Sequence, residues 1–415
     1  MVTSVQAPQR YNERFVSVLT EEQVPQAELI PEATRGGLAP YLLFCLAHFW
    51  VDFYSSALGV LQPLLIAQFG FSFTQAGILG GTLSFSSSVT QPVYGYLADR
   101  FHSRHFTVLA PAVAGIFISF LGYAPSYPAL LGMVFLAGAG MAAFHPHASS
   151  NATNTLQRSK ARAMAVFISS GTLGLAIGPT VFSFFTGRWG LHGAAAVAVP
   201  GIAVTALLLP LLKPERNSEI GEARPGFDWA PLQAVWKPML LLYMLVFLRS
   251  VVQITFTQFL PLYLKTQRGY SLSAASWSLS LYLIGGALGG VAGGNLADRF
   301  GGKRIILISM IGSTPLLALF LFTTGVPSAI GLFLGGLMLL FTIPVNVVMA
   351  QNLAPTQMGT VSALMMGFGW GMAGMIFIPL TGWISDHYSM QTAFSLLLVF
   401  PVLGIGLAAM LPDRR

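Results

Sequence analysis

The sequence predicts an all-α membrane protein with twelve transmembrane helices in two pseudo-symmetric six-helix bundles. Three observations predict this fold: a composition almost without charge, a series of long apolar runs, and an internal repeat. Of the 415 residues, 54% are hydrophobic and 8% are charged, and the mean hydropathy is +0.69. In a typical soluble protein, about a quarter of the residues are charged. Most of this chain is therefore expected to lie out of contact with water.

The apolar runs define the predicted spans and domains. A helix needs roughly 20 apolar residues to cross the hydrocarbon core of a bilayer. Runs of about that length occur on both sides of one long polar break. The predicted spans are 38–66, 75–97, 106–124, 128–152, 162–186 and 193–212, and then 238–264, 273–297, 304–324, 328–352, 360–383 and 391–411. We therefore expect an N-terminal tail (1–37), an N-terminal bundle (38–212), a linker (213–237) and a C-terminal bundle (238–412).

The basic residues predict the orientation in the membrane. With twelve spans, both termini and the linker share one side, and that side holds nearly all of the 21 Lys and Arg residues. Only Arg188, Lys265 and Arg268 fall on the other side. Cytoplasmic loops are enriched in Lys and Arg, so both termini, including the N-terminal tail, and the linker are expected in the cytoplasm. The protein itself is expected in the inner (plasma) membrane of the cell. The net charge of +7 then reflects topology, and no nucleic-acid partner is expected.

An internal repeat relates the two predicted bundles. The segment GYLADRFHSRH at 95–105 recurs as GNLADRFGGKR at 294–304, a shift of 199 residues. At a shift of 200, the same residue types recur in three more pairs: Gly171 and Gly371, Gly174 and Gly374, and Pro179 and Pro379. Repeats of this kind in membrane proteins typically place a binding site between the halves, near the middle of the membrane.

The repeated G-x-L-A-D-R motif resembles the signature loop of the major facilitator superfamily, whose members transport solutes by alternating access. The resemblance implies a latch that closes the cytoplasmic side, in which glycine permits close helix approach and aspartate meets the positive end of a neighbouring helix. The implied latch residues are Gly95, Asp99, Arg100, Gly294, Asp298 and Arg299. The alternative is that the motif only supplies charges that set topology.

Three further segments resemble one branch of that superfamily, the fosmidomycin-resistance transporters, which are bacterial inner-membrane exporters. These segments are LAHFWVD at 46–52, GAGMAAFHPHAS at 138–149 and AQNLAPTQMGTVSALMMGFGWGMAG at 350–374. The run GTLGLAIGP at 171–179 also partly matches the antiporter motif of the superfamily, although residues 180–182 depart from it. The resemblance implies efflux by antiport and a role in drug resistance.

Ionisable side chains inside the predicted spans mark the candidate site, since each costs at least about 2–3 kcal/mol there. They are His48, Asp52, His145, His147 and Arg249. By resemblance, their helices line the central cavity. His48 and Asp52 are four residues apart and so share a helix face, and histidine titrates near neutral pH. We predict that this pair couples transport to protons; the alternative is a fixed hydrogen bond between helices.

The remaining polar residues predict a substrate site. Arg249 is a permanent cation whose planar donors suit a carboxylate, phosphate or phosphonate. Gln253 follows one turn later, and His145 and Asn346 lie beside Pro146 and Pro344, which are expected to break corresponding helices of the two halves. The predicted substrate-binding residues are Arg249, His145, Gln253 and Asn346. The alternative role for Arg249 is to neutralise Asp52.

Together these features predict a secondary active transporter working by alternating access, namely proton-coupled efflux of a small anionic or polar compound. Proton-coupled uptake of an organic anion or phosphonate nutrient is the first alternative, and a non-transporting membrane sensor is the second. No catalytic constellation, cofactor or metal is expected, and the chain is not predicted to be an enzyme. The expected partners are the substrate, protons and the lipid bilayer, with the chain acting as a monomer.

Overall fold

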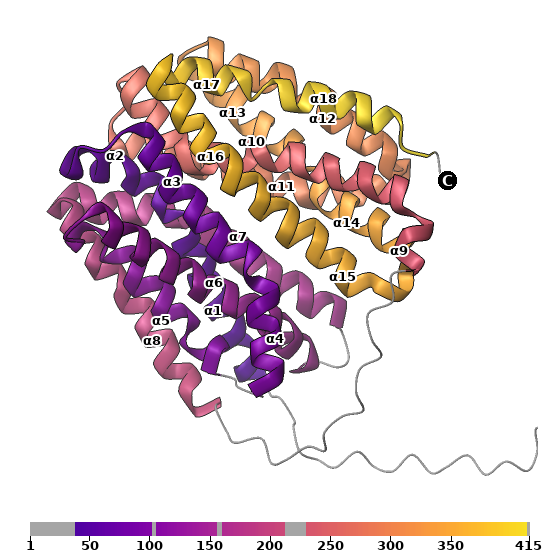
Figure 1. Cartoon of the computed structure of the whole chain (residues 1–415), viewed down its shortest axis with the longest axis horizontal. Helices are drawn as coiled ribbons and strands as arrows, with labels where there is room; N and C mark the ends of the chain where they lie inside the picture. The colour runs from indigo at the N-terminus through magenta and orange to yellow at the C-terminus, as the bar shows by residue number, and fades with distance from the viewer. Residues whose placement is uncertain (1–37, 102–104, 156–159, 212–229, 413–415) are drawn as a thin grey trace, which may run out of the picture.

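The structure is a computed structural model that describes residues 38–101, 105–155, 160–211 and 230–412 (Figure 1). These residues form helices joined by turns, with no strand among them. Ten helical stretches in this part of the chain are long and apolar enough to cross a membrane, and a shorter apolar helix covers His105–Ser119. The predicted tail and most of the predicted linker lie outside the described residues.

The first half contains six long helical segments, several of them built from consecutive elements. Gly70 ends the first segment in the left-handed region at φ 67°, where glycine carries no Cβ penalty. Ser72 then begins the second segment. In chain order the elements are α1 (Leu38–Ser55), α2 (Ala57–Phe69), α3 (Phe73–Ser84), the π-helix η1 (Phe85–Val89), α4 (Gln91–Phe101), α5 (His105–Ser119), η2 (Leu121–Tyr123), α6 (Tyr127–Thr155), α7 (Lys160–Trp189), η4 (Leu191–Val197), α8 (Ala198–Leu208) and η5 (Leu209–Leu211).

The second half also contains six long segments, so the predicted twelve-helix fold is confirmed. Within the stretch predicted as linker, a short helix α9 covers Ala230–Ala234. The elements that follow are α10 (Trp236–Arg268), α11 (Leu272–Phe300), α12 (Gly302–Phe322), α13 (Gly325–Leu340), α14 (Thr342–Leu353), η6 (Pro355–Gln357), α15 (Met358–Ser362), the π-helix η7 (Ala363–Phe368), α16 (Gly369–His387), α17 (Met390–Leu396) and α18 (Val399–Ala409).

The predicted pair of proline breaks occurs in one half only. The tenth segment is interrupted at Phe341, because Pro344 has no N–H to donate to the carbonyl of Leu340. Beside the interruption, the Ser309 hydroxyl of α12 donates to the Met338 carbonyl at 2.6 Å. In contrast, α6 continues through residues 145–147 without interruption. The expectation of matching breaks is therefore wrong for the first half.

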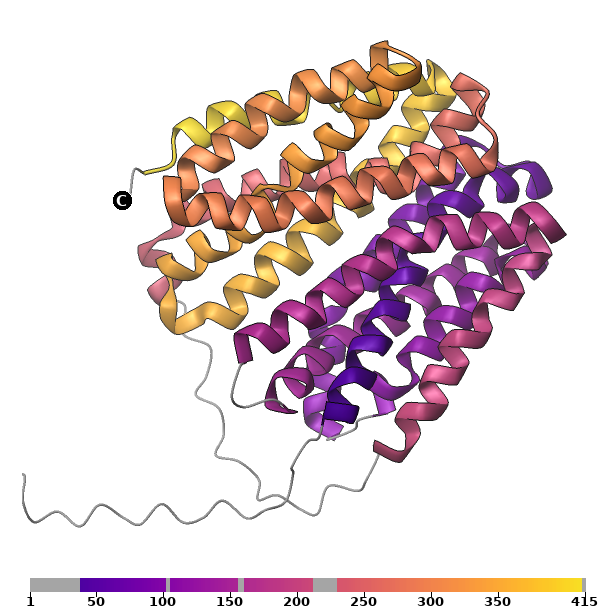
Figure 2. The ribbon, with the colours of Figure 1, turned by 180° about the vertical axis from the view of Figure 1, so that it is seen from behind.

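The two bundles meet at one end of the molecule and diverge toward the other (Figures 1 and 2). Across the boundary, α3 packs against α16, α2 against α10, and α7 against α11. Glycine allows these close approaches: a Cβ at Gly77 would lie only 2.7 Å from Pro379 Cα on the opposite bundle. The main contacts of α4 are with α6 and η1 of its own bundle.

Candidate functional site

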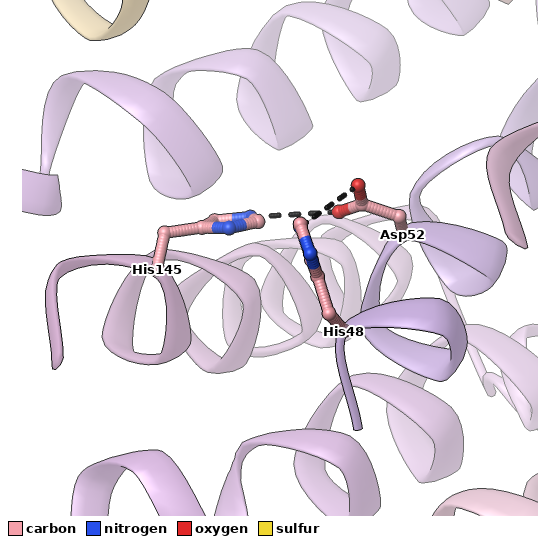
Figure 3. A group of neighbouring side chains, drawn as sticks. All are labelled: His48, Asp52 and His145. Carbon is pink, nitrogen blue, oxygen red and sulfur yellow. Dashed lines mark ion pairs between the residues drawn. The ribbon is translucent and has the colours of Figure 1, made fainter. Parts of the chain in front are cut away.

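Three ionisable side chains converge inside the first bundle: His48 and Asp52 of α1, and His145 of α6 (Figure 3). His48 Nε2 lies 3.3 Å from Asp52 Oδ2, and His145 Nε2 lies 3.6 Å from Asp52 Oδ1. The His48 side chain is buried, whereas those of Asp52 and His145 are partly exposed. Each oxygen of one carboxylate therefore faces a different imidazole.

The second ring nitrogen of His48 determines where a proton must lie. His48 Nδ1 donates a hydrogen bond to the Phe167 carbonyl oxygen at 2.7 Å, and the two rings stack at 4.2 Å. A carbonyl oxygen only accepts, so Nδ1 carries a hydrogen. If Nε2 held a lone pair, it would point at a carboxylate oxygen and repel it. The geometry therefore requires a proton between His48 Nε2 and Asp52, either as imidazolium or as carboxylic acid.

Among the described residues, the same three side chains form a group that could hold a metal ion. One ligand atom from each lies within 4.8 Å of the others. Two imidazoles and one carboxylate form a known type of catalytic zinc ligand set. A proton shared between His48 and Asp52 satisfies the same atoms without a metal.

Glycines of α7 form the surface on which α1 packs. A Cβ at Gly171 would collide with Asp52 Oδ2 and His48 Nε2, and one at Gly174 would collide with the backbone carbonyl of Phe49. The 171–179 run that partly matches an antiporter motif therefore includes glycines that bring α7 directly against the His48–Asp52 pair.

Gly174→Ala is expected to destabilise the protein. The new methyl group meets the backbone carbonyl of Phe49, which cannot rotate away, so α1 and α7 must separate; overpacking of this kind costs about 1–3 kcal/mol. Gly187→Ala, on the same helix with open space at its Cβ, is the matched control and should leave stability unchanged or slightly raised. Thermal unfolding in detergent measures both variants, and equal midpoints would contradict the packing argument.

Arg249 of α10 is buried, with 6% of its surface exposed, but it is not paired with the cluster. One terminal nitrogen donates to Gln253 Oε1 and the other donates to Ser250 Oγ at 3.1 Å. Its Nε has no hydrogen-bond partner. Within the described part of the chain, no carboxylate forms an ion pair with Arg249. The alternative in which Arg249 neutralises Asp52 is therefore not what the structure shows, and no carboxylate of the described residues compensates the charge of Arg249.

Asn346 and Tyr282 are among the other buried polar residues of the second bundle that lack hydrogen-bond partners among the described residues. Asn346 is fully buried, and both its amide oxygen and its amide nitrogen are unpaired. Tyr282 of α11 is also fully buried with an unpaired hydroxyl. Asn346 is one of the residues predicted from the sequence to bind substrate, whereas Tyr282 is not among them. A neutral tyrosine in an apolar helix gives no sequence signal.

The predicted latch residues lie at the end where the bundles diverge. A Cβ at Gly294 would reach ordinary contact with Pro344 at 3.5 Å. Asp298 and Arg299 are exposed, and Arg299 lies 5.4 Å from the centre of the Phe300 ring. The backbone of Gly95 belongs to α4. The side chains of the other two predicted latch residues, Asp99 and Arg100, lie outside the described residues.

Twelve helices in two bundles that meet at one end, with ionisable groups buried inside them, define a membrane transporter. Comparison with known proteins agrees: the sequence profile of the Major Facilitator Superfamily matches residues 44–276 and 242–415. The chain therefore belongs to the major facilitator superfamily. It is a multi-pass membrane protein, and its family and relatives are transporters and not enzymes.

Two relatives and one solved structure show how far the similarity extends. The chain is 27% identical over 407 residues to the fosmidomycin resistance protein of Escherichia coli K12, covering 96% of this chain and 99% of the relative. It is 28% identical over 382 residues to the uncharacterized MFS-type transporter YfnC of Bacillus subtilis 168, covering 90% and 93%. The fold is similar to the crystal structure of the nucleoside transporter NupG, with a TM-score of 0.72 at 14% identity, covering 90% and 99%.

Proposed function

We propose that this transporter exports a small anionic or polar compound in exchange for protons. The observation that carries the proposal is the His48–Asp52 pair, in which the Phe167 carbonyl orients the imidazole so that a proton must lie between ring and carboxylate. A buried site that needs a proton in one state and can release it in another is what coupling to a proton gradient requires. His145, on the other oxygen of Asp52, completes the proton site and contacts the substrate.

The buried charge of Arg249 supports an anionic substrate. A buried cation without a counterion is costly, and an anion that reaches Arg249 relieves this cost. Its planar donors suit a carboxylate or a phosphonate. Gln253 holds the guanidinium, and Asn346 offers an unpaired amide in the same bundle. We assign Arg249, Gln253, Asn346 and His145 to substrate binding on this basis.

The direction of transport is proposed from two considerations. One relative is named a fosmidomycin resistance protein, which is consistent with export of a toxic compound. In addition, an inside-negative potential of 100 mV favours outward movement of one negative charge by about 2.3 kcal/mol.

We place the chain in a bacterial inner membrane, as a monomer, with both termini in the cytoplasm. On this orientation the diverging ends of α4 and α15 face the cytoplasm, and the predicted motif residues at 95–100 and 294–299 close that side in the outward-open state.

A proteoliposome experiment tests the proposal. The purified protein is reconstituted with a pH-sensitive dye inside the vesicles, and fosmidomycin is added outside under a defined membrane potential. Antiport predicts that internal pH rises as the substrate enters, because protons leave in exchange. A fall in internal pH would indicate symport and favour proton-coupled uptake instead, and substrate entry without any pH change would reject coupling.

A further inference from the structure

Asp386, near the end of α16 in the second bundle, binds the first turn of α3 in the first bundle. Its Oδ1 accepts a hydrogen bond from the Phe73 backbone N–H at 2.9 Å. Its Oδ2 accepts two more, from the Thr74 backbone N–H at 2.8 Å and from the Thr74 hydroxyl at 2.6 Å. A single carboxylate therefore joins the two bundles by three hydrogen bonds.

These bonds complete the cap of α3. The first N–H groups of a helix have no partner within the helix. Ser72 Oγ accepts from the Gln75 N–H at 3.2 Å, and Gln75 Oε1 accepts from the Ser72 N–H at 2.9 Å, forming a capping box. The N–H groups of Phe73 and Thr74 remain, and Asp386 satisfies them both. The cap of this helix is thus divided between the two bundles.

Asp386 itself is exposed, and the helices that it joins are tightly packed one to two turns away. A Cβ at Gly382, one turn before Asp386, would collide with the Phe73 carbonyl, and one at Gly77 would lie 2.7 Å from Ile378 O. This contact closes the end of the molecule opposite the diverging ends of α4 and α15 (Figures 1 and 2). In a transporter that alternates access, this end must open.

We propose that Asp386 is an electrostatic latch that holds this end closed and that releases when the two bundles separate there. The proposal rests on the alternating access proposed above, and the proposed orientation places the latch on the outer side. Opening would leave the Phe73 and Thr74 N–H groups to water and would remove the carboxylate from the positive end of α3. The latch therefore favours the state that is closed outside.

The related contact of the repeat, between α7 and α11, has no carboxylate at the position that corresponds to Asp386. At the shift of 200 residues, the counterpart of Asp386 is Thr186 of α7, the helix that packs against α11. The Thr186 hydroxyl donates to the Phe182 carbonyl of its own helix at 2.8 Å. The α7–α11 contact thus lacks a carboxylate at this position, although the two helices pack against each other.

Distance measurement between spin labels tests the latch. Cys45 is the only cysteine, so Cys45→Ser provides a background for Tyr123→Cys and Val326→Cys, which carry labels on exposed positions of the two bundles. Without substrate, the protein with Asp386 intact should show mainly the short distance between the two labels, which corresponds to the closed outer end. Asp386→Asn should raise the long-distance population about tenfold, the order of effect seen when a helix cap is removed. Thr74→Val, which deletes only the hydroxyl, should raise it less.

His387→Gln is the matched control, because His387 is an exposed neighbour whose ring bonds only within its own helix. The distance distribution of His387→Gln should match that of the protein with Asp386 intact. Distance distributions for Asp386→Asn and Thr74→Val that both coincide with this control would overturn the proposal. The measurement needs neither substrate nor a proton gradient. If the distance measurement contradicts the latch, the proposal of proton exchange is unaffected. If no proton exchange is found, the result for the latch still holds.

Discussion

Asp52→Asn is expected to abolish proton-driven transport while the protein remains folded. The amide cannot take up a proton, and it no longer stabilises a proton on His48 Nε2, from which Asp52 Oδ2 is 3.3 Å away. Because the amide offers no proton to exchange between the two sides, we expect at least about a hundredfold loss of gradient-driven transport, equivalent to roughly 2.7 kcal/mol. Substrate efflux from vesicles with and without an imposed pH gradient measures the loss.

Exchange of labelled for unlabelled substrate at equal pH is the internal control for this variant. Such exchange needs substrate binding and movement of the bundles but no net proton transfer, so Asp52→Asn should retain it. Full gradient-driven transport by the variant would remove Asp52 from the coupling role. Loss of both activities would instead show that Asp52 is needed for binding or folding.

Arg249→Ala is expected to weaken binding of an anionic substrate by about 30-fold to about 5000-fold, since truncating one partner of a buried charged pair costs about 2–5 kcal/mol. Arg249→Lys keeps the charge but loses the planar donors, including the bond to Gln253. Its affinity for the substrate should therefore lie between that of the unmodified protein and that of Arg249→Ala. Calorimetric titration with fosmidomycin measures each variant. Arg188→Ala, at an exposed position on α7, is the control and should bind normally.

Thermal stability separates this role from a structural one. Arg249 has no carboxylate partner among the described residues, so its replacement by alanine leaves no acid stranded and removes a buried uncompensated charge. The substrate-free variant should therefore unfold at the same temperature as the unmodified protein or higher. A large drop in unfolding temperature, with affinity unchanged, would assign Arg249 to packing of the second bundle.

Much of the proposed proton site could be predicted from local chain geometry. His48 and Asp52 were expected on one helix face from their spacing, and the structure places their side chains 3.3 Å apart. An α-helix holds residues four apart on one face whatever it packs against. The partner of Arg249 could not be predicted in this way. The repeat relates positions along the chain and does not determine how far α10 is rotated about its axis.

What the sequence by itself determined is the set of properties that belong to single helices: twelve apolar stretches of membrane-spanning length, their duplication, and the His48–Asp52 pair. Only the tertiary structure decided that His145 joins that pair, that Gly171 lies against it, and that Asp386 caps α3. These contacts join residues separated by about one hundred to three hundred positions. They depend on how helices rotate and cross when side chains pack, and no short-range pattern in the chain encodes those angles.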